Sequence, residues 1–76
     1  MSKDNARAIQ RGRILAAIRR LGPSTRDRLE AATRIHGNSL RPRVRELMAT
    51  RSIRVVRGRI GTSRTGRRAQ LLEATK

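Results

Sequence analysis

Apolar residues recur at helical spacing along the first third of the chain, with arginines on the other faces. A repeat of about 3.6 residues is typical of an amphipathic helix, so residues 5–21 are predicted to be helical. Gly22 suits the position just after a helix, and Pro23 cannot continue one. The apolar face consists of Ile9, Ile14, Leu15, Ile18 and Leu21.

A second, shorter helix is predicted over residues 25–34. Ser24 or Thr25 can cap it, with Asp27 or Arg28 at the third helical position. The pair Ser24 and Asp27 resembles a capping box in which Asp replaces Glu.

The apolar face of the second helix is predicted to contain Leu29, Ala32 and Ile35. The segment "HGN" should end this helix, because Gly37 can adopt positive φ without strain.

The third helix is predicted over residues 39–50 and contains a proline. With Ser39 as the N-cap, Pro42 is the third helical residue, where the missing N–H has no intrahelical partner in any case. Asn38 is an alternative cap that would place Pro42 one position deeper. The core face consists of Leu40, Val44, Leu47 and Met48, with Arg41, Pro42 and Arg45 pointing away and Arg43 and Glu46 on the flanks.

The spacing of apolar residues changes after residue 52 from a helical to an alternating pattern. Ile53 and Val55 alternate with Arg54 and Val56, which predicts a strand, and the glycine-rich segment 57–67 is expected to form a hairpin tip or loop. Residues 68–74 can be a returning strand or a helix. The strand is favoured because residues 53–56 need an antiparallel partner.

These elements predict one domain over residues 1–76. It belongs to the α+β class and is mainly α, with three helices and a C-terminal two-stranded β-hairpin over residues 53–72.

Composition points to a polyanionic partner. The 76 residues contain 20 Lys and Arg against 5 Asp and Glu, for a formal net charge of +15 at pH 7. Such an excess repels itself in a compact fold, so double-stranded DNA or another polyanion is the expected partner. Residues 51–68 alone carry seven arginines and no acid.

Several kinds of chemistry are not expected. The chain contains no Cys and one His, His36, so we expect no metal site, and we expect His36 to be solvated. Its acidic residues are scattered, so we expect neither an enzyme nor a bound cofactor. No apolar run approaches the length of a membrane span of about 20 residues, so a cytoplasmic, nucleoid-associated protein is expected.

Two stretches resemble a known family. "STRDRLEAATRIHGNSLRPRVRELMATRSIRVV" and the later "RTGRRAQLL" are similar to small phage and bacterial winged helix-turn-helix proteins. The resemblance covers roughly residues 13–72. Arg51 or Ser52 stands where the family usually has Gly before the first strand. The resemblance implies DNA binding, with the third helix in the major groove and the hairpin, or wing, on the backbone or minor groove.

Candidate base contacts lie at the start of the third helix. Recognition helices direct their N-terminal residues toward base edges, and arginine can hold guanine O6 and N7 bidentately. The competing interpretation is that the polar residues cap the helix and the arginines contact phosphates. The candidates are Asn38, Ser39, Arg41, Pro42 and Arg45.

Candidate backbone contacts lie in the wing and at the second helix. Arg59 or Arg64, expected near the wing tip, can enter a narrow minor groove. Thr25 and Arg26 start a helix, so they can bind phosphate, or Thr25 can serve as a cap alone. The arginines of the first helix are expected to be solvated. The wing candidates are Arg54, Arg57, Arg59, Arg64, Arg67 and Arg68.

Three functions compete at this point. A sequence-specific transcriptional regulator leads, and a non-specific architectural binder is the second. The third is a winged-helix module that docks on polymerase or replication proteins through an apolar patch of Val56, Ile60 and Leu72. RNA is disfavoured because the chain has no aromatic residue for stacking. A weak homodimer is compatible with a palindromic site.

Overall fold

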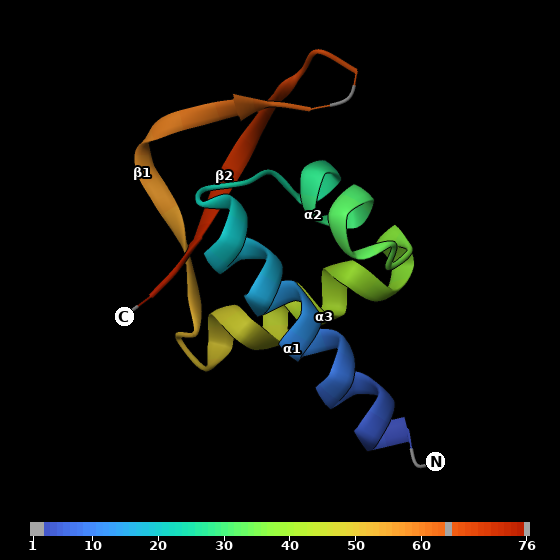
Figure 1. Ribbon diagram of the computed structural model, residues 1–76. Coiled ribbons are helices and arrows are strands. Elements are labelled where there is room, and N and C mark those ends of the chain that lie inside the picture. The colour runs from blue at the N-terminus through green and yellow to red at the C-terminus, as the bar shows by residue number, and fades with distance from the viewer. Residues whose placement is uncertain (1–2, 64, 76) are drawn as a thin grey trace.

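Three helices followed by an antiparallel hairpin make up the computed structural model, which describes residues 3–63 and 65–75 (Figure 1). The predicted α+β, mainly helical fold is confirmed. The elements are α1 (Lys3–Leu21), α2 (Arg26–Thr33), α3 (Gly37–Ala49), β1 (Ile53–Thr62) and β2 (Arg68–Ala74).

An aliphatic core joins all of these elements except the outer half of the hairpin. It lies where α1, α2 and α3 meet the inner half of the hairpin (Figure 1). Burying these side chains is the main favourable contribution to folding, at about 25 cal/mol per Å² of apolar surface. The buried hydrophobic residues are Ile14, Ala17, Ile18, Leu29, Ile35, Leu40, Val44, Leu47, Ile53 and Leu72.

Helix α1 extends beyond the elements that it packs against. Ile14 and Ile18 are buried as predicted, and Gly22 has φ 80° and donates its N–H to the Ile18 carbonyl at 2.8 Å. Ile9 is 53% exposed, so its assignment to the core was wrong. The first turns of α1 extend past the other elements toward the N-terminus (Figure 1), which accounts for the exposure of Ile9.

Helix α2 begins at Arg26, with Thr25 as its N-cap. The Thr25 hydroxyl accepts a hydrogen bond from the Arg28 N–H at 3.2 Å, so the proposed capping box of Ser24 and Asp27 is wrong. Ala32 is exposed and Thr33 is buried in its place. A polar residue is tolerated there because the Thr33 hydroxyl donates to the Leu29 carbonyl at 2.6 Å.

The end of α2 does not use glycine. Arg34 adopts the left-handed conformation at φ 58°, whereas Gly37, expected to have positive φ, is the first residue of α3. Arg13 of α1 stabilises this end, because its guanidinium donates to the Thr33 carbonyl at 2.7 Å. A cation beside the last carbonyls of a helix is favourable for the same reason that a C-cap is.

Helix α3 starts before either predicted cap. His36 is the N-cap, and its Nδ1 accepts a hydrogen bond from the Asn38 N–H at 3.2 Å. Pro42 is therefore the sixth helical residue and lies inside the helix. It withdraws a hydrogen bond from the Asn38 carbonyl. Asn38 and Pro42 are both exposed, so water can replace the lost partner.

The turn after α3 is tight although it lacks glycine. Arg51 has φ 61° and donates its N–H to the Met48 carbonyl at 3.0 Å, while Ser52 donates to the Leu47 carbonyl at 2.8 Å. This is the hydrogen-bond pattern of a Schellman motif. Arg51 thus adopts the left-handed conformation that glycine most often supplies in this motif.

The hairpin is longer than predicted and its two strands are unequal. Residues 68–74 form a strand, as favoured over a helix, and β1 continues to Thr62. Val55 pairs with Leu72 and Ile60 pairs with Gln70, so four residues of β1 lie opposite Leu71 alone. We call this irregularity, residues 56–59, the bulge.

Two contacts fix the hairpin on the helices. Ser24, in the turn between α1 and α2, exchanges both backbone hydrogen bonds with Leu72, at 2.9 and 2.8 Å. Farther out, Gly61 packs against α2: a Cβ at this position would lie 2.8 Å from both Thr25 Cγ2 and Leu71 Cδ2. The outer half of the hairpin therefore runs over the start of α2 (Figure 1).

We predict that Gly61→Ala lowers the free energy of unfolding by about 1–3 kcal/mol, because Thr25 is a short capping side chain that cannot move aside freely. Urea unfolding followed by circular dichroism measures the change.

Gly12→Ala is the control. Gly12 lies within α1 and a Cβ there meets nothing within 4 Å. This substitution should raise the free energy of unfolding by about 1 kcal/mol through helix propensity alone. A stabilising effect of Gly61→Ala would contradict the close approach described here.

Candidate nucleic-acid interface

One face of α3 is exposed along its length. Asn38, Arg41, Pro42, Arg45 and Ala49 follow one another at helical spacing, and all are exposed. The opposite face carries the buried Leu40, Val44 and Leu47. Four of the five predicted base-contact residues thus share one surface. Ser39, the fifth, is half-buried at its flank.

The exposed face of α3 borders a hollow of about 730 Å³ that continues in two directions. One extension leads to the inner half of the hairpin and shares Met48 with it. The other leads to the start of α2 and shares Arg26 and Arg41. Gln70 of β2 lines both extensions, so the three hollows surround one region between α3 and the hairpin.

We call this region the α3 groove. It is lined by arginines from α2, α3, the following turn and both strands. They are Arg26, Arg41, Arg45, Arg51, Arg54, Arg57 and Arg68.

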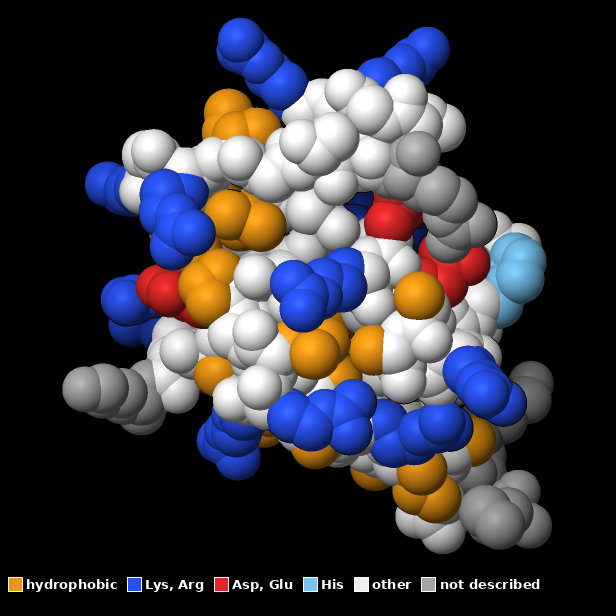
Figure 2. Space-filling view, turned by 45° about the horizontal axis from the view of Figure 1, so that its top comes forward, with side chains coloured by type: hydrophobic (Ala, Val, Ile, Leu, Met, Phe, Trp, Pro, Cys, Tyr) orange, Lys and Arg blue, Asp and Glu red, His pale blue; other side chains and the backbone are white. Residues whose placement is uncertain are grey.

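Acidic side chains are confined to one end of the α3 groove. Asp27 and Glu30 of α2 line the extension near Gly37 and Ser63. Basic side chains project around much of the molecular outline, whereas acidic ones occupy small areas (Figure 2). A groove lined mainly by one sign of charge concentrates the field on a ligand of the opposite sign.

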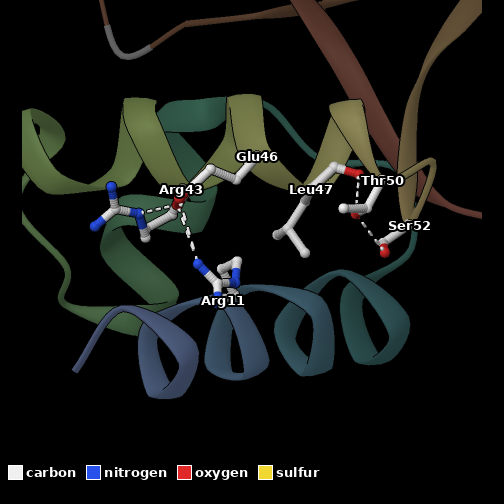
Figure 3. Close-up of polar contacts among 6 residues, drawn as sticks. All are labelled: Arg11, Arg43, Glu46, Leu47, Thr50 and Ser52. Carbon is white, nitrogen blue, oxygen red and sulfur yellow. Dashed lines mark hydrogen bonds and ion pairs between the residues drawn. The ribbon is translucent and has the colours of Figure 1, made fainter. Parts of the chain in front are cut away.

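An ionic contact fixes α3 on α1. Glu46 lies between two arginines (Figure 3): its carboxylate accepts hydrogen bonds from Arg11 of α1 at 3.3 Å and pairs with Arg43 one turn earlier at 2.5 Å. The Arg43 Nε is buried without an aligned hydrogen bond, so its charge depends on Glu46. The side chains that hold α3 are thereby directed away from its exposed face.

The two predicted phosphate ligands at the start of α2 differ in their exposure. Thr25 is only 7% exposed, and its hydroxyl accepts the capping hydrogen bond from the Arg28 N–H, so little of this side chain is presented to a ligand. Arg26 is half-exposed and lines two of the three hollows, next to Arg41 of α3.

The predicted wing residues are spread over the hairpin. Arg54 donates to Glu73 on the neighbouring strand at 2.7 Å. Arg57 and Arg59 belong to the bulge, so Arg59 is not near the tip as expected. Arg67 lies at the tip and Arg68 begins β2, both exposed. Arg64 lies outside the described residues.

The apolar patch proposed for protein docking does not form as predicted. Leu72 is fully buried in the core. Ile60 is 62% exposed and Val56 is half-buried, which leaves a smaller apolar surface on β1.

Sequence reasoning missed several residues of the α3 groove, among them Met48, Arg51 and Gln70. Met48 fits the core period and is only half-buried. Arg51 falls in a turn that carries no periodic signal. Gln70 could have been found, because successive residues of a strand point to opposite faces. Alternation therefore places Gln70 on the face opposite to that of its neighbour Leu71.

Among the described residues, no group of three or more His, Asp or Glu could hold a metal ion. His36 is exposed and serves as the α3 cap. In the described part of the chain, no helix has both the length and the apolar character needed to cross a membrane.

Comparison of the chain with family models, curated proteins and solved structures gives no match. The order of three helices and an antiparallel hairpin is consistent with winged-helix topology.

We predict that Glu46→Ala lowers the free energy of unfolding by about 1–3 kcal/mol, because it leaves the buried Arg43 Nε uncompensated. Urea titrations at low and high salt measure this. The loss should shrink at high salt, where repulsion between Arg11 and Arg43 is screened.

Glu73→Ala is the matched control. It removes an acid whose partner Arg54 is 68% exposed, so its cost should stay below about 1 kcal/mol. Equal costs for the two substitutions would show that Glu46 does not hold α3 in place.

Proposed function

We propose that this protein binds double-stranded DNA and acts as a sequence-specific transcriptional regulator. The observation that carries the proposal is the exposed face of α3. Arg41 and Arg45 lie there one turn apart, and neither pairs with an acidic side chain among the described residues. The core, in contrast, engages only the opposite face of the helix.

Helix α3 is suited to the major groove. A groove about 12 Å wide admits an α-helix, and it presents a distinct donor and acceptor pattern for each base pair. Arg41 or Arg45 holding guanine O6 and N7 would contribute about 1–3 kcal/mol of discrimination. Asn38 can donate to and accept from adenine at the start of the same face.

The remaining arginines of the α3 groove supply affinity that does not depend on sequence. Arg26 and Arg68 flank Arg41, from α2 and β2 respectively. Contacts of this kind with phosphates set the orientation of a protein on the duplex. They also release condensed counterions, so binding should weaken steeply as salt rises.

Selection of bound duplexes from a random DNA pool at about 150 mM salt tests the proposal, because non-specific attraction is partly screened there. We expect a defined sequence motif. An inverted repeat would indicate binding as a homodimer. Retention of duplexes without any motif would replace the regulator by an architectural DNA-binding protein, and no retention at all would refute DNA binding.

We predict that Arg45→Ala reduces binding to the selected site by about 5- to 100-fold, with little change on random duplexes, because a base contact is lost. Titration of labelled duplexes at fixed salt measures both affinities.

Arg20→Ala is the charge-matched control. Arg20 is exposed on α1 and does not line the α3 groove. This variant should keep the preference for the selected site. If Arg45→Ala weakened both duplexes equally, Arg45 would be a phosphate contact instead.

A further inference from the structure

The bulge in β1 has an unusual form for a hairpin strand. Val56, Arg57, Gly58 and Arg59 all lie opposite Leu71, so three residues of β1 are additional to the ladder. Gly58 has φ 77°, and a Cβ there would meet nothing within 4 Å. Gly58 therefore suits this position because of its positive φ, and not because a neighbouring atom would clash with a side chain.

The bulge turns the hairpin. At this point β1 bends sharply, and the outer half of the hairpin runs across toward α2 (Figure 1). Gly61, just past the bulge, packs on Thr25, and Thr62 and Ser63 share a hollow with the start of α2. The end of β1 and Ser63 therefore lie beside the start of α2, and the bend is the corner of the hairpin.

The bulge, in contrast, lies on the side of α3. Arg57 lines the α3 groove together with Met48 of α3 and Arg51. Arg57, Gly58 and Arg59 are all exposed. Among the described residues, neither arginine pairs with an acid, whereas the nearby Arg54 is paired with Glu73.

The tip has a different electrostatic setting. Ser63 and Arg68, on either side of the tip, line a hollow that also contains the carboxylates of Asp27 and Glu30. These carboxylates lie among Arg26, Arg41 and Arg68 in that hollow, so the positive charge beside the tip is partly offset. No acidic side chain lines the hollow that Arg57 of the bulge borders.

We propose that the bulge, not the hairpin tip, is the part of the hairpin that contacts DNA. Arg57 and Arg59 bind phosphates of the backbone beside the groove that α3 enters, and Gly58 shapes the projection that carries them. The inference rests on the proposed DNA binding, and it assigns the hairpin contact to a different segment from the one that a winged helix would suggest.

Two double variants of equal charge test this inference. Arg57→Ala with Arg59→Ala removes two arginines from the bulge. The tip variant, Arg67→Ala with Arg20→Ala, removes one at the tip and one on α1, both outside the α3 groove. Because both lower the net charge equally, long-range attraction to DNA falls equally in both. A difference between them therefore reports direct contact.

Affinity for a random-sequence duplex is measured for both variants over a range of salt concentrations. The bulge variant should bind on the order of tenfold more weakly near 0.15 M salt, and the slope of log K against log salt should fall by about 2. The tip variant should bind within about threefold of the unaltered chain. Circular dichroism melting of each variant confirms that it is folded.

A third variant, Arg57→Lys with Arg59→Lys, examines the chemistry. A phosphate contact needs positive charge more than a guanidinium, so this variant should bind within about threefold of the unaltered chain. A loss as large as that of the alanine pair would overturn phosphate contact.

The remaining outcomes separate the two proposals. If the tip variant loses as much affinity as the bulge variant or more, the bulge is not the contact, while DNA binding stands. If the unaltered chain binds no duplex, the proposed function fails, and the assignment of the bulge fails with it.

Discussion

The position of the hairpin depends on the pairing of Ser24 with Leu72. Two backbone hydrogen bonds join the turn after α1 to the middle of β2, and the Leu72 side chain is fully buried at the same point. This contact closes the core from the side that the helices leave open. It also sets where β1 runs relative to α3, so the width of the α3 groove follows from it.

Charge is the main force acting against this arrangement. The sequence has five acids for 20 basic residues, and two of these acids join elements. Glu46 connects α1 to α3, and Glu73 connects the two strands. The Glu30 carboxylate comes within 3.2 Å of where a Gly37 Cβ would be, close to the start of α3, where negative charge is favourable. Among the described residues, the groove arginines other than Arg54 form no ion pair with an acid.

The periodic parts of the fold could be predicted from sequence, and the exceptions have physical causes. Ile14, Ile18, Val44 and Leu47 are buried as the helical period indicates. Ile9 continues the same period but lies on a stretch of helix with no neighbour. His36 is a weaker N-cap than Ser or Asn by preference, so the start of α3 was placed too late.

The candidate site was predictable only in part. The exposed face of α3 follows from the period of its core residues, which is why Arg41 and Arg45 were identified. The α3 groove depends on elements that are distant in sequence: Met48 of α3 and Gln70 of the hairpin line one hollow. The bulge is invisible to pattern analysis, because residues 56–59 belong to a strand without alternation.

The sequence separation of Ser24 and Leu72 determines when this fold can form. Local contacts allow the helices to appear quickly, but pairing partners this far apart must close a long loop before their contact contributes. The core therefore stays open on the side of β2 until Leu72 pairs with Ser24, so formation of the complete fold waits for this long-range contact.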